Sequence, residues 1–127
     1  MTDEKYTILC VDDDKDFVES VKMVLDANGY NVETAASAEE GLKKFKAKKP
    51  DFMLVDLMME EVDAGVGLVK EIKLLGNTAP IFLLSSVGEQ LNISVDHHEL
   101  GLSGVFQKPV NFDNLLTTIA EKLSKAK

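Results

Sequence analysis

Short apolar runs alternate with longer amphipathic segments five times along this chain, and this alternation constrains its fold more than any other feature. Many residues in the runs are β-branched or aromatic, which is typical of strands. Most runs are apolar on both faces, as expected where helices cover both sides of a parallel sheet. The predicted strands are Thr7–Val11, Asn31–Ala35, Phe52–Asp56, Ile81–Ser85 and Gly104–Gln107.

Between these strands, apolar residues recur at the spacing of helices that bury one face. One helical stripe ends before Gly29 and another before Gly76, and glycine commonly follows the last turn of a helix. Ser37 and Glu40 form a capping-box pattern that begins a further helix. A helix is also expected within residues 88–100, although Asn, Ser, Asp and His have little helix propensity. The stripes consist of Phe17, Val21, Val24 and Leu25; Leu42 and Phe45; Leu68, Ile72 and Leu75; and Phe112, Leu115, Leu116, Ile119 and Leu123.

This order of elements predicts an α/β fold, a doubly wound five-stranded parallel sheet with helices on both faces and right-handed crossovers. The length of 127 residues fits one domain, so residues 1–127 are expected to form a single domain. The chain contains no evident linker, internal repeat or low-complexity segment.

Charge and composition exclude several classes of function. The formal net charge of −8 argues against a surface for nucleic acid or for an anionic membrane, because both require clustered cations. Cys10 is the only cysteine, so an intrachain disulfide is impossible. The N-terminus lacks the apolar core of a signal peptide, and no apolar run approaches the ~18 residues of a membrane span. We therefore expect a soluble, cytoplasmic protein.

Polar residues lie at the carboxyl ends of four of the predicted strands, either as the last residue of the strand or just after it. Asp12–Asp14 follow the first strand, Asp56 ends the third, Ser85 ends the fourth, and Lys108 follows the fifth. Ligands of open α/β sheets bind beyond the carboxyl ends of the strands. Any one of these residues alone could be an ordinary turn or surface residue. Because they occur at four strand ends together, they predict a ligand-binding or catalytic site at this edge of the sheet.

The chemistry of this group indicates a hard divalent cation. Two carboxylates about 4 Å apart repel each other by roughly 4 kcal/mol at the effective dielectric of a protein surface. Mg²⁺ relieves this repulsion, because it prefers oxygen ligands and typically takes one or two carboxylates plus phosphate oxygens. A carboxylate beside the metal can attack a phosphoryl group, while an ammonium and a hydroxyl neutralise the transferred oxygens.

At the level of motifs, the chain resembles the response-regulator receiver domain of two-component signalling. The segments ILCVDDD, PDFMLVDLMM, PIFLLSS and LGLSGVFQKPV are each similar to a conserved strand motif of that family. The match covers essentially the whole chain. It implies a flavodoxin-like fold with strand order 2-1-3-4-5.

The resemblance also implies individual roles. Asp56 would be the phosphoacceptor, and Ser85 and Lys108 would be the catalytic and switch residues. The bond between Lys108 and Pro109 would be a cis peptide.

By the same resemblance, the cofactor would be Mg²⁺. Asp13, Asp56 and the backbone carbonyl of Met58 would bind the cation directly, and Asp12 would bind it through water.

A receiver domain accepts its phosphoryl group from a sensor histidine kinase or a His-phosphotransfer protein and signals by conformational change. The implied activity is therefore not that of an enzyme with an external substrate, although the domain promotes its own phosphorylation and dephosphorylation. Dimerisation through the face of the fourth helix, the fifth strand and the last helix is also implied. The sequence does not identify the kinase, the downstream partner or an appended output domain.

The sequence departs from the family pattern at several positions. Val105 occupies the position of the switch aromatic, and the adjacent Phe106 would point to the opposite face of the strand. Glu60 replaces a proline that usually follows the acceptor strand. Met58 and Val87 occupy the rim positions, where neither side chain can hold a water by hydrogen bonding. We expect them to shield the phosphoryl group and slow its hydrolysis.

Two alternatives remain open. A pseudo-receiver would keep the fold as an interaction module but never be phosphorylated. A haloacid-dehalogenase-type phosphatase also combines a nucleophilic Asp with Ser or Thr, Lys and Mg²⁺, and Asp12 and Asp14 could mimic its first motif. However, Asp16 stands where that family has Thr or Val, and no acidic pair follows Lys108.

Overall fold

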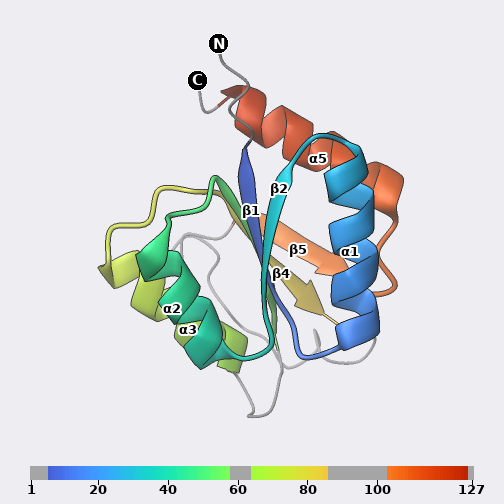
Figure 1. Ribbon diagram of the computed structural model, residues 1–127. Coiled ribbons are helices and arrows are strands. Elements are labelled where there is room, and N and C mark those ends of the chain that lie inside the picture. The colour runs from blue at the N-terminus through green and yellow to red at the C-terminus, as the bar shows by residue number, and fades with distance from the viewer. Residues whose placement is uncertain (1–5, 58–63, 86–102, 126–127) are drawn as a thin grey trace.

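The computed structural model describes residues 6–57, 64–85 and 103–125, which form a five-stranded parallel sheet with helices on both faces (Figure 1). The strand order is β2-β1-β3-β4-β5, and all five strands have their predicted bounds. The helix expected within residues 88–100 lies outside the described residues. The elements are β1 (Thr7–Val11), α1 (Lys15–Ala27), β2 (Asn31–Ala35), α2 (Ala38–Ala47), β3 (Phe52–Asp56), α3 (Ala64–Leu74), β4 (Ile81–Ser85), β5 (Gly104–Gln107) and α5 (Phe112–Lys125).

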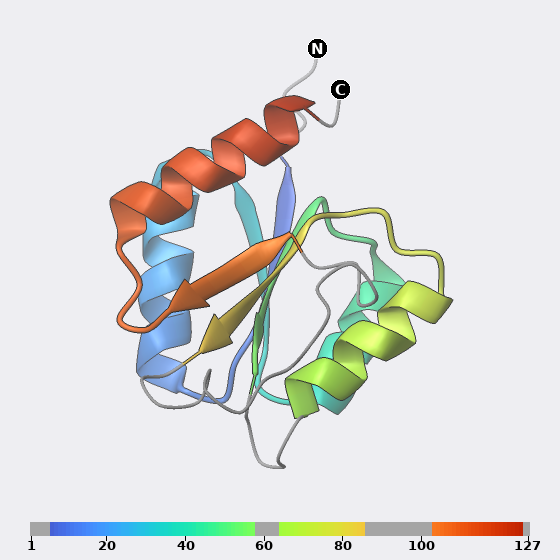
Figure 2. The same cartoon turned by 180° about the vertical axis from the view of Figure 1, so that it is seen from behind.

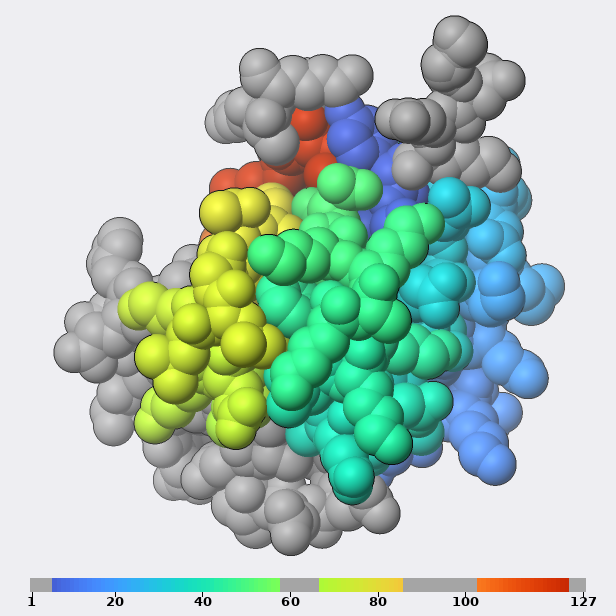
Figure 3. Space-filling view, turned by 60° about the vertical axis from the view of Figure 1, so that its left-hand side comes forward, coloured from blue at the N-terminus to red at the C-terminus, as the bar shows by residue number. Residues whose placement is uncertain are grey.

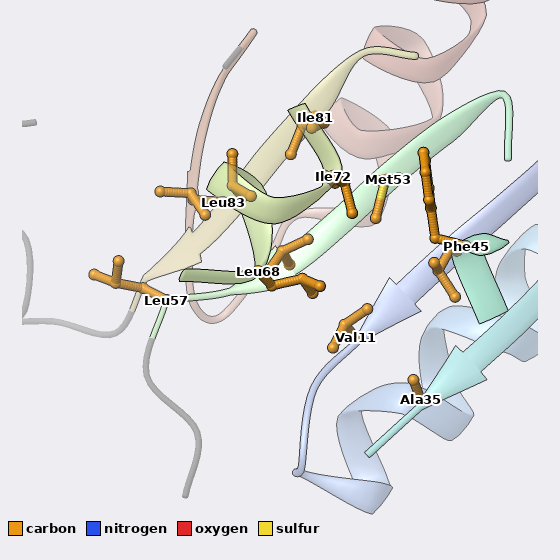
Figure 4. Packing of buried hydrophobic residues seen from close by; sticks show 12 residues of the cluster. Val11, Ala35, Phe45, Met53, Leu57, Leu68, Ile72, Ile81 and Leu83 are labelled. Carbon is orange, nitrogen blue, oxygen red and sulfur yellow. The ribbon is translucent and has the colours of Figure 1, made fainter. Parts of the chain in front are cut away.

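Two apolar cores lie on opposite faces of the sheet because successive strand side chains alternate in direction. The helices α1 and α5 cover one face, and α2 and α3 cover the other (Figure 2). Figure 3 shows α2 and α3 side by side over their face. Figure 4 shows how Phe45 of α2 and Ile72 of α3 pack against Val11 and Met53 of the sheet. The opposite core includes Ile8, Cys10, Phe52, Leu54, Phe82, Leu84, Leu115 and Ile119.

The central strands differ from the edge strands in burial. Every residue of β1, β3 and β4 is buried, as the apolar runs predict. In contrast, exposed and partly buried residues alternate through β5 and most of β2, because these strands form the two edges of the sheet. Among the residues that the structure describes, no helix combines the length and apolar character needed to cross a bilayer.

The predicted start of α2 and the predicted glycine turns after α1 and α3 are confirmed. Glu40 N donates to Ser37 Oγ at 3.1 Å, and the Glu40 carboxylate accepts from Ala36 N at 2.8 Å. Gly29 and Gly76 both adopt positive φ, 89° and 87°, just after the helices that they terminate. These turns end α1 and α3 shortly before β2 and β4 begin.

Gly41 allows α2 to approach the sheet closely. A Cβ atom at this position would lie 2.9 Å from Val11 Cγ2 and 3.2 Å from Leu68 Cδ2, inside normal contact distance. We therefore expect Gly41→Ala to lower the free energy of unfolding by about 1–3 kcal/mol, as overpacking does. Urea denaturation measures this change. Gly67→Ala is the matched control, because a Cβ there meets nothing within 4 Å and should raise stability by about 0.5–1 kcal/mol.

Candidate functional site

Three aspartates meet at the carboxyl edge of the sheet. β1 and β3 are neighbours with Val11 paired to Val55, so Asp12 and Asp56 are the next residues along the two strands. Both are buried, whereas Asp13 is exposed. Carboxylate oxygens of these three aspartates all lie within 4.8 Å of one another. The structure thus places the predicted metal-ligating side chains close enough to share one cation.

Lys108 reaches this acidic cluster from β5. Its Nζ lies 2.7 Å from Asp12 Oδ2 and 3.6 Å from Asp56 Oδ2. The backbone N of Lys108 donates to Ser85 O at 2.7 Å, so the pairing of β4 with β5 also fixes the position of Ser85. The peptide bond between Lys108 and Pro109 is cis, as the resemblance led us to expect.

The charge of Lys108 is stabilised where it lies. Partial burial favours the neutral amine, but the hydrogen bond to Asp12 and the charges of Asp12 and Asp56 outweigh it and raise the pKa of Lys108. Burial raises the pKa of the Cys10 thiol, and the nearby Asp12 charge raises it further. Both effects favour the protonated thiol, and Cys10 packs as a buried residue of the core on the α1 and α5 face.

Asp14, the third aspartate of the run, has a different role from the other acids in the site. Its side chain caps α1 by accepting from Phe17 N at 3.2 Å. Its own backbone N donates to Asp12 Oδ1 at 2.9 Å. The run of three aspartates therefore combines residues of the acidic cluster with a helix cap.

Phe17 contributes to the site in a way that the sequence did not reveal. The Nζ atom of Lys108 lies 4.8 Å from the centroid of the Phe17 ring. The helical stripe identified Phe17 only as a core residue, and it does pack against the core on the α1 and α5 face. No local motif marks the additional contact, because it joins α1 to the end of β5.

The family model described as "Response regulator receiver domain" matches residues 8–120. The chain belongs to this family.

Individual relatives agree with the family assignment. The "Transcriptional regulatory protein ZraR" of Escherichia coli (strain K12) is 32% identical over 124 residues, which is 98% of this chain and 28% of that protein. The "Alkaline phosphatase synthesis transcriptional regulatory protein PhoP" of Bacillus subtilis (strain 168) is 34% identical over 102 residues, 80% of this chain and 42% of that protein. The chain thus spans less than half the length of either of these relatives.

Solved structures also resemble this receiver domain. A "response regulator receiver domain protein (CheY-like)" from Methanospirillum hungatei superposes with a TM-score of 0.87 at 32% identity and covers 96% of both chains. The chemotaxis protein CheY4 of Vibrio cholerae superposes with a TM-score of 0.83 at 28% identity, covering 94% of this chain and 99% of that one.

Val105 and Phe106 of the receiver domain lie on opposite faces of β5, as expected. Val105 pairs with Leu83, which belongs to the core under α2 and α3. Val105 itself is 41% exposed. Phe106 packs on the other face, where its ring lies 5.0 Å from the ring of Phe82. Phe106 therefore does not replace the missing aromatic at position 105. The positions Met58, Glu60 and Val87 lie outside the described residues.

Proposed function

We propose that this receiver domain accepts a phosphoryl group on Asp56 in a Mg²⁺-dependent reaction. The donor would be the phosphohistidine of a sensor histidine kinase or of a His-phosphotransfer protein. The observation that carries the proposal is the position of the Asp56 carboxylate, which shares a cluster with Asp12 and Asp13 and lies 3.6 Å from Lys108 Nζ. This arrangement would combine a nucleophile, cation ligands and a nearby positive charge.

The donor atoms of the cluster fit Mg²⁺. Asp12, Asp13 and Asp56 all present carboxylate oxygens, the hard ligands that Mg²⁺ prefers. The backbone carbonyl of Met58 is the further ligand that the resemblance implies. When bound, the cation would neutralise charge on the carboxylates and on the phosphoryl oxygens.

The residues of the chain have separate tasks in this reaction. A carboxylate oxygen of Asp56 forms a bond to phosphorus while the bond between phosphorus and the donor histidine nitrogen breaks. The Lys108 ammonium moves from Asp12 toward the new phosphoryl oxygens, and the hydroxyl of Ser85 donates a hydrogen bond to them. Rearrangement around Ser85 and Lys108 then carries the signal.

The receiver domain is proposed as a signalling protein rather than as an enzyme, because the phosphoryl group ends on the chain itself and leaves by hydrolysis. Turnover of a phosphate ester would instead favour a phosphatase of the haloacid-dehalogenase type. A protein that cannot be phosphorylated would favour a pseudo-receiver.

The partners follow from the same proposal. A kinase or phosphotransfer protein would meet the domain at the carboxyl edge of the sheet in the cytoplasm. ZraR and PhoP are transcriptional regulatory proteins by name, so we propose that the signal passes to an output domain or to a separate downstream protein. Dimerisation through the face that includes β5 and α5 would be one means of transmission.

Mass spectrometry of the intact protein tests the proposal. After incubation with Mg²⁺ and acetyl phosphate, the protein should gain the mass of one phosphoryl group, and excess EDTA should prevent the gain. Equal phosphorylation with and without EDTA would contradict the proposed role of the cation. Absence of the modification with acetyl phosphate and also with phosphorylated His-phosphotransfer proteins would support the pseudo-receiver.

Asp13→Ala tests the metal ligands. Asp13 supplies one of the three carboxylates, and even residues that only support a ligand typically cost about 10- to 100-fold in metal affinity when removed. We expect Asp13→Ala to weaken Mg²⁺ binding by at least about tenfold. Isothermal titration calorimetry measures the affinity. Asp16→Ala is the matched control, because it removes the same charge from an exposed residue of α1 outside the cluster. Equal affinity of the Asp13 and Asp16 variants would remove Asp13 from the site.

A further inference from the structure

Four contacts form a closed loop around Lys108. Asp12 Oδ1 accepts from Asp14 N at 2.9 Å, and Asp14 Oδ1 accepts from Phe17 N at 3.2 Å. The ring of Phe17 lies 4.8 Å from Lys108 Nζ, which pairs with Asp12 Oδ2 at 2.7 Å. The first turn of α1 and the end of β5 are thus connected through the acidic motif.

We propose that Phe17 is a positioning residue that holds the Lys108 ammonium against the acceptor site. This inference rests on the proposed phosphorylation of Asp56. The face of an aromatic ring attracts a cation, most strongly where water is partly excluded. The Lys108 side chain is 18% exposed, so the ammonium has a partly desolvated position beside the ring.

The ring restricts a side chain that would otherwise be mobile. Lysine carries a compact charge on a flexible stem, and an acidic partner alone does not fix its direction. Phe17 lies beside the ammonium, while Asp12 and Asp56 attract it toward the cluster. Attraction to a ring face has no single hydrogen-bond direction, so it can persist while Nζ shifts from Asp12 toward a phosphoryl group on Asp56.

The helix cap formed by Asp14 positions the ring of Phe17. Phe17 N donates to Asp14 Oδ1, and Asp14 N donates to Asp12 Oδ1. The residues of the acidic motif therefore orient both the ring and the lysine partner. A purely structural role for Phe17 is the alternative, because the side chain is half-buried against the core on the α1 and α5 face.

Three changes at position 17 separate these roles. Phe17→Leu keeps an apolar side chain but removes the ring, and Phe17→Tyr keeps the ring. Site-specific incorporation of 3,4,5-trifluorophenylalanine keeps nearly the same shape but weakens the negative face of the ring. The measurement is the rate of phosphorylation by acetyl phosphate at saturating Mg²⁺ over a range of donor concentrations.

We expect Phe17→Leu to lower the maximal rate by about threefold to tenfold, with the half-saturating donor concentration unchanged. Phe17→Tyr should restore the rate, and the trifluorinated protein should fall between them. Tyr30→Leu is the matched control, because Tyr30 is a half-buried aromatic residue on the same core that follows the other end of α1. It should lower stability to urea and leave the rate unchanged.

The outcomes distinguish this inference from the function on which it rests. A phosphorylated wild-type protein with an unchanged rate in Phe17→Leu, or in the trifluorinated protein, would overturn the positioning role alone. A rate that falls equally in Tyr30→Leu would assign the effect to packing and also overturn it. A wild-type protein that never gains the phosphoryl group would overturn both proposals.

Discussion

The Asp56→Asn variant is expected to gain no phosphoryl group from acetyl phosphate under conditions that modify the wild-type protein fully. An asparagine side chain has nearly the same size as aspartate, but its neutral amide cannot act as the nucleophile. The variant should fold normally, because removal of one negative charge reduces repulsion with Asp12 and Asp13. Mass spectrometry of the intact protein and urea denaturation measure the two properties.

Asp26→Asn provides the control for the change in net charge. Asp26 pairs with Lys22 on the exposed surface of α1, where ion pairs contribute little to stability. This variant should be phosphorylated like the wild-type protein. Phosphorylation of Asp56→Asn to the wild-type extent would show that another residue accepts the group. If neither Asp56→Asn nor Asp26→Asn is phosphorylated, the effect is not specific to Asp56.

A large loss of stability is expected for Lys108→Met in the absence of divalent cations. The Asp12 side chain is fully buried, and this substitution removes the ammonium that lies 2.7 Å from its carboxylate. Removal of one member of a buried ion pair typically costs 3–5 kcal/mol. We expect a loss of about 3 kcal/mol in the free energy of unfolding, measured by urea denaturation with EDTA, because Lys108 itself is only partly buried.

The double variant Asp12→Asn with Lys108→Met separates this cause from lost packing. It removes both charges of the closer ion pair, so that of the two carboxylates that Lys108 contacts only the more distant one, Asp56, remains. We expect the double variant to recover most of the stability that Lys108→Met loses. A double variant less stable than Lys108→Met would contradict the account, since it would mean that Asp12 stabilises the fold without its partner.

The sequence alone predicted most of the fold. The strands had clear bounds because β1, β3 and β4 are buried at every residue and therefore read as continuous apolar runs. The strand order did not follow from these runs, since no local pattern states which strands are neighbours. The order came from the family resemblance and is confirmed in the structure.

The proximity of several candidate residues followed from topology. Parallel strands end at one edge, so Asp12, Asp56 and Lys108 were expected to lie close together there, and Lys108 Nζ lies within 3.6 Å of both carboxylates. The distinct role of Asp14 was not predicted, because three identical residues in a row do not reveal which one caps a helix. The contact of Phe17 with Lys108 was missed for a similar reason, as it depends on how α1 packs beside the end of β5.

The identity of the modified residue is the most direct test of the central claim that Asp56 is the phosphoacceptor. Borohydride reduces an aspartyl phosphate to homoserine, so reduction of the phosphorylated protein followed by peptide sequencing by mass spectrometry locates the acceptor. The account predicts homoserine at position 56, only in samples treated with both Mg²⁺ and acetyl phosphate. Homoserine at position 12 or 13, or a phosphorylated protein without homoserine at 56, would contradict it.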